Sequence, residues 1–159
     1  MPLIEMYERP GFLLRRAHQI SAAIFESSCA ELSLTQAQYG ALTVVSSEPG
    51  IDQTRLAKAL AFDKVTVLRV VRGLEERGLI AREVSTTSRR HMAVRLTPAG
   101  GRLLKKSEVS VHEAYNRLMA PLNATQREQF IALLQQLTDG LGEEARAAFV
   151  PLARPTSGR

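Results

Sequence analysis

Apolar residues recur at helical spacing at both ends of the chain. In the N-terminal part, a long helix is predicted to follow Pro10 and Gly11 and to run to about Cys29. Its apolar stripe, with a 3.6-residue period, consists of Leu13, Ala17, Ile20 and Ile24. A helix is also predicted from Pro98 toward Met119, where Pro121 ends it. A last helix is predicted from a second apolar stripe: Phe130, Leu133, Leu134, Leu137 and Leu141. The chain is therefore predicted to be mainly α-helical.

Short polar residues mark the expected helix starts. Thr35 with Gln38 predicts a capping box for a helix that carries Leu42 and Val45 inward and stops at the Glu48-Pro-Gly turn. Further N-caps are expected at Asp52, Asp63 and Thr97, the last with Pro98 at the first helical position. The last helix is predicted to begin with the capping box Thr125-Gln-Arg-Glu128.

The centre of the chain has the pattern of a helix-turn-helix followed by a hairpin. Helical segments at 52–60 and 63–77 are separated only by Ala61 and Phe62. A strand pattern then follows Gly78, turns at a polar tip over 85–90 and returns to Leu96. The predicted fold class is mainly α with a small β-hairpin wing, a winged helix-turn-helix of the kind that reads duplex DNA.

The long outer helices predict a second copy of the chain. We expect one domain over 1–159, with a DNA-binding lobe at 35–97 and dimerisation helices at 10–34 and 98–145. Long apolar stripes on either side of so small a lobe are most economically buried between two copies, as a homodimer. Such a dimer places two recognition helices in successive major grooves of double-stranded DNA, on a palindromic operator.

Composition narrows the class of protein. The chain is 45% hydrophobic, enough for a core, but no apolar run approaches the roughly 18 residues of a membrane span. The first ten residues contain acids and lack the apolar stretch of a signal peptide, and the single cysteine fits a reducing compartment. We expect a cytoplasmic protein without a membrane partner. The histidines are too scattered for a metal set, and no phosphate loop or nucleophile elbow appears, so no enzyme, cofactor or metal is expected.

Charge is concentrated on the predicted DNA-binding segment. Residues 52–106 hold 13 Lys and Arg against 5 Asp and Glu, a local charge of +8. The rest of the chain holds 8 basic and 11 acidic residues, a charge of −3. A concentrated basic surface is what a phosphate backbone requires. The plainer alternative is a solvated face that happens to be basic.

The predicted recognition helix separates its residues by face. Winding residues 64–77 at 100° per residue places Val67, Val70, Val71 and Leu74 on one side. The candidate DNA contacts are the outward residues Lys64, Val65, Thr66, Arg69 and Arg72, the opening of the preceding helix, Gln53, Thr54 and Arg55, and the wing arginines Arg89 and Arg90. Guanidinium groups grip guanine edges, and helix N-termini favour phosphate. The alternatives are an ion pair of Arg69 with Glu76 or Asp63, and a bridge from Arg90 to its own domain.

Several segments together resemble the MarR family. They are Leu34-Thr-Gln-Ala-Gln-Tyr-Gly-Ala-Leu42, the Leu-Ala-Lys-Ala-Leu helix, Asp63 through Thr66, Leu74-Glu-Glu-Arg-Gly-Leu79, and Arg89-Arg90 to Leu96-Thr-Pro-Ala-Gly100. The resemblance implies a homodimeric repressor that binds a palindrome and releases it when a small, often aromatic and anionic, ligand binds. One departure is that Ser88-Arg89-Arg90 stands where many members have Asp-x-Arg, so the acid that pins the second arginine is absent.

The resemblance also implies an effector site near the first long helix. Opposite its apolar stripe, Arg15 is placed to pair with a carboxylate and His18 to bond a ring substituent. Other candidate ligand-binding residues are Gly11, Leu14, Tyr39, Tyr7 and Arg9. The alternative is that Arg15 is solvated and that His18 is a packing residue.

The segment Glu8 to His18 further resembles MarR regulators of aromatic-acid breakdown, and most of all the nicotinate-degradation repressors. That resemblance implies a hydroxylated pyridine carboxylate such as 6-hydroxynicotinate as the effector.

A second function class is a thiol-based redox sensor at Cys29, but Cys29 sits at the C-terminal end of a helix, where the dipole disfavours a thiolate, and near Glu26 and Glu31. A third is a winged helix used only for protein contacts.

Overall fold

The computed structural model describes residues 3–153. Its helices are α1 (Leu3–Tyr7), α2 (Pro10–Ser28), α3 (Gln36–Ser47), α4 (Gln53–Ala59), α5 (Lys64–Glu76), α6 (Pro98–Met119) and α7 (Ala124–Gly140). Its strands are β1 (Ile51–Asp52), β2 (Ile80–Val84) and β3 (Met92–Leu96), and single 3-10 turns lie at η1 (Ala30–Leu32) and η2 (Gly142–Glu144). No helix within residues 3–153 is both long enough and apolar enough to cross a membrane.

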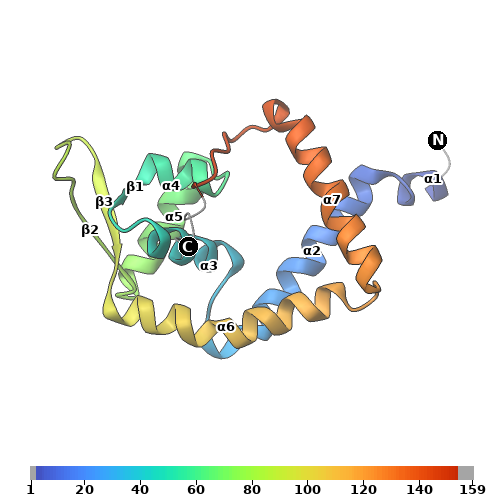
Figure 1. Cartoon of the computed structure of the whole chain (residues 1–159), viewed down its shortest axis with the longest axis horizontal. Coiled ribbons are helices and arrows are strands. Elements are labelled where there is room, and N and C mark those ends of the chain that lie inside the picture. The colour runs from blue at the N-terminus through green and yellow to red at the C-terminus, as the bar shows by residue number, and fades with distance from the viewer. Residues whose placement is uncertain (1–2, 154–159) are drawn as a thin grey trace, which may run out of the picture.

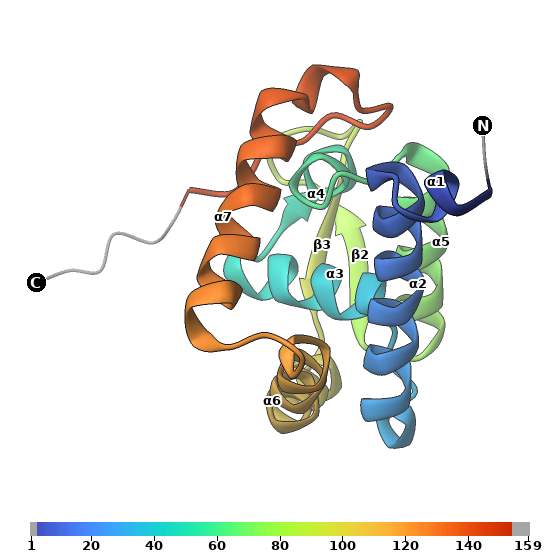
Figure 2. The same cartoon turned by 90° about the vertical axis from the view of Figure 1, so that its right-hand side faces the viewer.

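The elements divide into a compact lobe and a set of outer helices. Helices α3, α4 and α5 gather with the sheet at one end of the molecule, and α6 leads away from that end (Figure 1). Figure 2 looks along α6 and shows α2 and α7 rising on opposite sides of it. We call residues 35–97 the lobe and α1, α2, α6 and α7 the outer helices.

The three strands form one antiparallel sheet in the order β1-β3-β2. Ile80 pairs with Leu96 and Val84 with Met92, so the predicted hairpin wing is present, and the predicted fold class is confirmed. The short strand β1 was not predicted. It pairs Ile51 with Val94 over only two residues, which is too short for an alternating pattern to show in the sequence.

Side-chain caps start the helices at the predicted places, with one exception. Thr35 and Gln38 form the capping box of α3, and Asp52, Asp63 and Thr97 accept the backbone N–H groups of Arg55 (2.8 Å), Thr66 (2.7 Å) and Gly100 (3.1 Å). The predicted capping box at Thr125 is wrong. Asn123 caps α7 instead, and Gln126 completes the box, because asparagine caps as well as threonine and stands two residues earlier, after the turn at Pro121.

The hydrophobic core is centred on the lobe and extends to Phe25 and Cys29 at the end of α2 and to Ala114 of α6. The helices of the lobe and strand β3 pack together through fully buried side chains. These are Leu42 of α3, Leu56 of α4, Val71 and Leu74 of α5, and Val94 of β3. The predicted inward residues of α5, namely Val67, Val70, Val71 and Leu74, are all buried. Burial of this stripe fixes the rotation of α5, and therefore fixes which of its side chains face outward.

The outer helices leave much of their apolar surface exposed in the single chain. No residue of α7 is buried, and in α2 only Phe25 is. Leu13 is 51% exposed and Leu133 is 64% exposed. The exposed apolar residues of α2 and α7 are Leu13, Leu14, Ile20, Phe130, Ile131, Leu133 and Leu137. Large apolar side chains exposed in this number on the outer helices indicate an interaction surface.

The joint between the lobe and α6 gives a stability prediction. A Cβ atom on Gly100 would lie 1.9 Å from the carbonyl oxygen of Leu79, whereas one on Gly101 would meet nothing within 4 Å. We expect Gly100→Ala to lower the free energy of unfolding by about 1–3 kcal/mol, because the added methyl group overpacks the contact with Leu79. Gly101→Ala should raise it by up to about 1 kcal/mol through helix propensity. Urea unfolding of both variants measures this, and equal effects of the two substitutions would contradict the assigned contact.

Candidate DNA-binding surface and effector residues

A tight turn joins α4 to α5 and orients them as a helix-turn-helix. The N–H of Phe62 donates to the carbonyl of Ala57 (2.9 Å), and Ala61 takes a left-handed conformation with φ of 53°. Asp63 then caps α5, and hydrogen bonds from Thr66 lower the pKa of its carboxyl. The carboxylate therefore stays ionised at the N-terminus of α5, where the helix dipole favours negative charge.

The outer face of α5 is exposed and cationic. Val65 is 67% exposed, and Arg69 and Arg72 are exposed beside it. These three side chains, with Leu68, Gly73 and Glu76, line one shallow hollow along the helix. Within residues 3–153 the ion pairs are Arg55–Glu48, Arg82–Glu75 and Arg95–Glu83, so Arg69 and Arg72 form none there. Lys64 is exposed at the start of the same helix, and Thr66 is half-buried.

The residues that open α4 divide into two groups. Thr54 is exposed and Gln53 half-buried, and both line a groove that continues to Lys64 of α5. Arg55 is engaged elsewhere. Its Nε lies 2.8 Å from Oε1 of Glu48, and its Nη2 donates to Oε2 of the same carboxylate (3.0 Å). A DNA phosphate would have to compete with Glu48 for this guanidinium.

The wing carries Arg89 and Arg90 at its exposed tip. The tip is closed by a hydrogen bond from the Ser85 N–H to the carbonyl of His91 (2.9 Å). The backbone N–H of Arg90 lies 3.4 Å from the Ser88 hydroxyl, and neither arginine side chain takes part in the ion pairs of residues 3–153. Both guanidinium groups therefore stand at the end of the hairpin, at the place from which a wing reaches a minor groove.

The wing is pinned at its base, by a pair that sequence reasoning missed. Arg82 of β2 binds Glu75 of α5 through both Nε and Nη2, with Nε 3.1 Å from Oε2. The hydrogen bond from Arg82 lowers the pKa of Glu75, and Glu75 raises the pKa of Arg82. The pair ties the wing to the recognition helix. No periodic pattern signals it, because the two residues belong to different elements on either side of the Gly78 turn.

A second missed contact joins α5 to the outer helices. At the C-terminal end of α5, Nη1 of Arg77 donates to the carbonyl of Ser33 (2.7 Å) and Nη2 donates to that of Leu32 (2.9 Å). Leu32 and Ser33 lie in the connection between α2 and α3. One guanidinium therefore links the end of the recognition helix to the connection that follows α2.

The predicted effector residues are spread along α2. Gly11, Leu14, Arg15 and His18 are exposed on this helix, and Arg9 is exposed just before it. The guanidinium of Arg15 lies 5.1 Å from the ring centre of Phe12, and the ring of Tyr7 meets Phe12 edge-on at 5.2 Å. Tyr39 instead packs against Phe25, at 5.8 Å.

These contacts form two groups rather than one. Phe12 and Phe25 are thirteen residues apart on one helix, a rise of about 20 Å. Within one chain, Tyr7 and Tyr39 are therefore not brought together around a single small ligand. Arg15 and His18 lie between them, one helical turn apart.

Cys29 is fully buried at the C-terminal end of α2. Burial and the nearby Glu113 raise the pKa of its thiol. Both effects disfavour the thiolate that reacts with peroxides.

The helix-turn-helix, the antiparallel wing and the exposed arginines on α5 together define a winged-helix DNA-binding protein. Comparison with known proteins supports this assignment. The MarR family model matches residues 34–92. The transcriptional repressor NicR of Pseudomonas putida is 30% identical over 135 residues, which span 85% of each chain. The chain belongs to the MarR family and is a transcriptional regulator.

Solved structures of ligand-responsive regulators share the fold. The PcaV regulator of Streptomyces coelicolor, in complex with its natural ligand, superposes with a TM-score of 0.80 at 28% identity, covering 87% of this chain and 98% of that one. The similarity extends to BpsR of Bordetella bronchiseptica, whose DNA binding is regulated by 6-hydroxynicotinic acid. BpsR gives a TM-score of 0.75 at 31% identity and covers 81% of this chain and 98% of its own.

The surface predicts graded effects of arginine substitutions on a duplex selected by the wild-type protein from a random-sequence pool. Arg69→Ala should weaken binding by about 1–3 kcal/mol and relax base preference at one position, whereas Arg90→Ala should weaken binding to all sequences and lower the salt slope by about one. Titrations at several salt concentrations measure both effects. Wild-type affinity in a variant with Arg69, Arg72, Arg89 and Arg90 all replaced by alanine would exclude this surface.

The wing anchor predicts a pH dependence. The pKa of Glu75 lies below its ordinary value of 4.5, so the pair adds stability above that pH and loses it as the pH falls through the lower, folded-state pKa. Glu75→Gln should therefore reduce the free energy of unfolding at neutral pH, and the difference from wild type should vanish in acid. Glu76→Gln is the control, because Glu76 forms no ion pair within the described residues. A pH-independent difference for Glu75→Gln would contradict the ionic origin.

Proposed function

We propose that this regulator is a homodimeric repressor that binds a palindromic operator and is released by a small aromatic carboxylic acid. The observation that carries the proposal is the outer face of α5, where Arg69 and Arg72 are exposed without ion pairs among the described residues. The opposite face of α5 is buried, so these groups stand on a rigid support, as base reading requires. The role is binding, with no catalytic step.

The proposed dimer uses the outer helices, within residues 10–34 and 98–145. In the single chain these helices expose large apolar side chains, including Leu13, Ile20, Phe130 and Leu133. A two-fold symmetric interface buries the same patch on both copies. It also sets two copies of α5 on one face of the duplex, about one helical turn apart, so the operator is proposed to be palindromic.

The proposed effector site is centred on Arg15 and His18. Arg15 pairs with the carboxylate of the acid, and His18 bonds its ring hydroxyl or ring nitrogen. Leu14 and Gly11 supply an apolar wall and space for a flat ring. The proposal is supported by the similarity to BpsR, whose regulator is a hydroxylated pyridine carboxylic acid, so 6-hydroxynicotinate is the first candidate. The proposed site lies between Tyr39 at one end and Tyr7 and Arg9 at the other.

Release of DNA follows from the link that Arg77 makes between α5 and the connection after α2. An acid bound against α2 favours one position of that helix relative to the lobe. The connection after α2 is held by Arg77 through the carbonyls of Leu32 and Ser33, so a displaced α2 moves the end of α5. The proposed effect is a population shift toward dimers whose recognition helices no longer match the operator. We prefer this mechanism to thiol sensing because Cys29 is buried and its thiol pKa is raised.

The proposal predicts selective binding of one acid. The purified protein is titrated with 6-hydroxynicotinate, nicotinate, salicylate and 4-hydroxybenzoate, followed by thermal shift and by release from a selected duplex. We expect 6-hydroxynicotinate to raise the melting temperature and to release DNA, and both effects to be lost in Arg15→Ala and His18→Ala. The physical reason is that each substitution removes one of the two polar partners of the acid.

Arg16→Ala is the matched control, because Arg16 is also an exposed arginine, one residue further along α2 and 100° around the helix. It should respond like wild type. If none of the acids binds a protein that is competent on DNA, the effector site is wrong while the DNA-binding role stands. If peroxide releases the DNA from wild type but not from Cys29→Ser, the thiol mechanism replaces it.

A further inference from the structure

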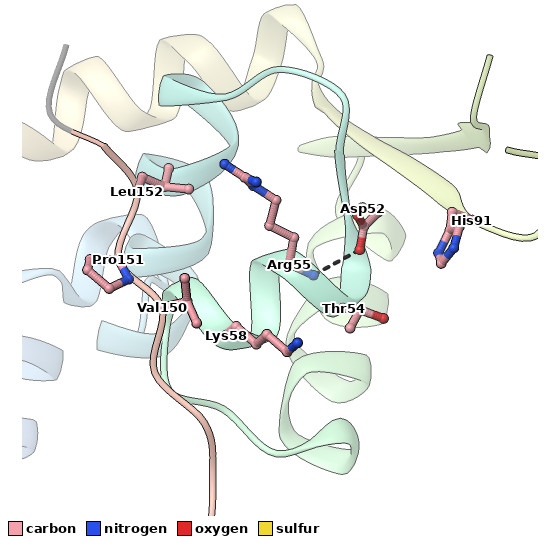
Figure 3. A pocket seen from close by; sticks show the side chains of 8 residues that line it. All are labelled: Asp52, Thr54, Arg55, Lys58, His91, Val150, Pro151 and Leu152. Carbon is pink, nitrogen blue, oxygen red and sulfur yellow. Dashed lines mark hydrogen bonds between the residues drawn. The ribbon is translucent and has the colours of Figure 1, made fainter. Parts of the chain in front are cut away.

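The segment that follows α7 returns to the lobe. Residues 145–153 leave the end of η2 and run across α4 (Figure 1), where Val150, Pro151 and Leu152 lie beside Arg55 and Lys58 (Figure 3). We call residues 145–153 the C-terminal strap. Helix α7 itself makes few contacts with the lobe, so the strap is its main attachment there.

A backbone hydrogen bond fastens the strap to α4. The N–H of Val150 donates to the carbonyl of Lys58 at 2.9 Å. Lys58 lies in the last turn of α4, where carbonyl groups lack partners within the helix. The same carbonyl also accepts the N–H of Ala61 at the longer distance of 3.3 Å, in the turn that leads to α5. The strap therefore binds the helix-turn-helix at its turn.

Apolar contacts on both sides of this bond hold the strap in place. Leu152 is half-buried and packs against the hydrophobic core of the lobe. On the other side, Ala147 is half-buried, and Arg146, Ala147 and Ala148 line the groove between α4 and the N-terminal half of α5. The strap thus touches both helices of the DNA-binding unit, although it belongs to the chain beyond α7.

We propose that the C-terminal strap is a positioning element for DNA recognition, which sets the angle between α7 and the lobe. The lobe is otherwise joined to the outer helices through α3, which packs against α2 and α6, and through β3, which packs against α6, whereas α4 packs mainly within the lobe. The strap adds an attachment at α4, on another side of the lobe, and so restrains the tilt of the lobe relative to α7. This inference rests on the proposed dimer, in which the angle of each lobe sets the separation of the two recognition helices.

The direct test measures the angle without DNA. Spin labels are placed on exposed sites of α7 and β2 through Gln129→Cys and Ala81→Cys in a Cys29→Ala background, and labelled chains are diluted with unlabelled ones. Val150→Pro removes the N–H donor, whereas Val150→Ala keeps it and is the matched control. We expect one narrow distance distribution in the parent and in Val150→Ala, and a clearly broader one in Val150→Pro. Equal widths in all three overturn the proposal.

A second measurement connects the strap to recognition. On the duplex selected by wild type, insertion of one base pair at the dyad should weaken wild-type binding about tenfold, within the range for one mismatched base pair. Val150→Pro should tolerate the insertion with less than about a threefold loss, because its lobes adapt. If Val150→Pro loses as much affinity as wild type when the base pair is inserted, the positioning role is contradicted. Failure of wild type to select any duplex refutes the proposed function instead, and the label distances still decide whether the strap holds the lobe.

Discussion

The structure depends on the burial of one side of α5. Val67, Val70, Val71 and Leu74 are sealed into the core of the lobe by Leu42, Leu56 and Val94, which fixes both the position and the rotation of the helix. At 100° per residue, that burial leaves no freedom for Arg69 and Arg72, which must face outward. The cationic surface is thus a geometric consequence of the core, and the wing, the turn and the caps hold this helix in its place.

Three polar contacts attach other parts of the molecule to this unit. Arg82 ties the wing to Glu75, Arg77 ties the connection after α2 to the end of α5, and Val150 ties the strap to the turn after α4. Each holds a different segment against the helix-turn-helix. The recognition helix is therefore connected both to the helix that carries the candidate effector residues and to the segment that ends the described chain.

The features that were predictable from the sequence are local ones. The caps at Thr35, Asp52, Asp63 and Thr97, and the buried stripe of α5, follow from residues within a turn or two of one another. The choice between Asn123 and Thr125 was not decided in this way, because both residues cap well and only the path of the chain after Pro121 selects one. The ion pair of Arg82 with Glu75, strand β1 and the strap depend on which segments meet in space, and no period along the chain records that. For the effector residues, the sequence indicated the helix that carries most of them. It did not indicate that Tyr7 and Tyr39 lie far apart, because that follows from their packing against Phe12 and Phe25.

The central claim is that two copies of α5 read one duplex together. Hydroxyl-radical footprinting of the selected duplex tests this most directly, because it reports where the protein covers the backbone without depending on any substitution. Two protected patches related by a dyad, with centres about 10 bp apart on one face of the helix, are the predicted result. A single protected patch, or two patches on opposite faces of the duplex, would contradict the account.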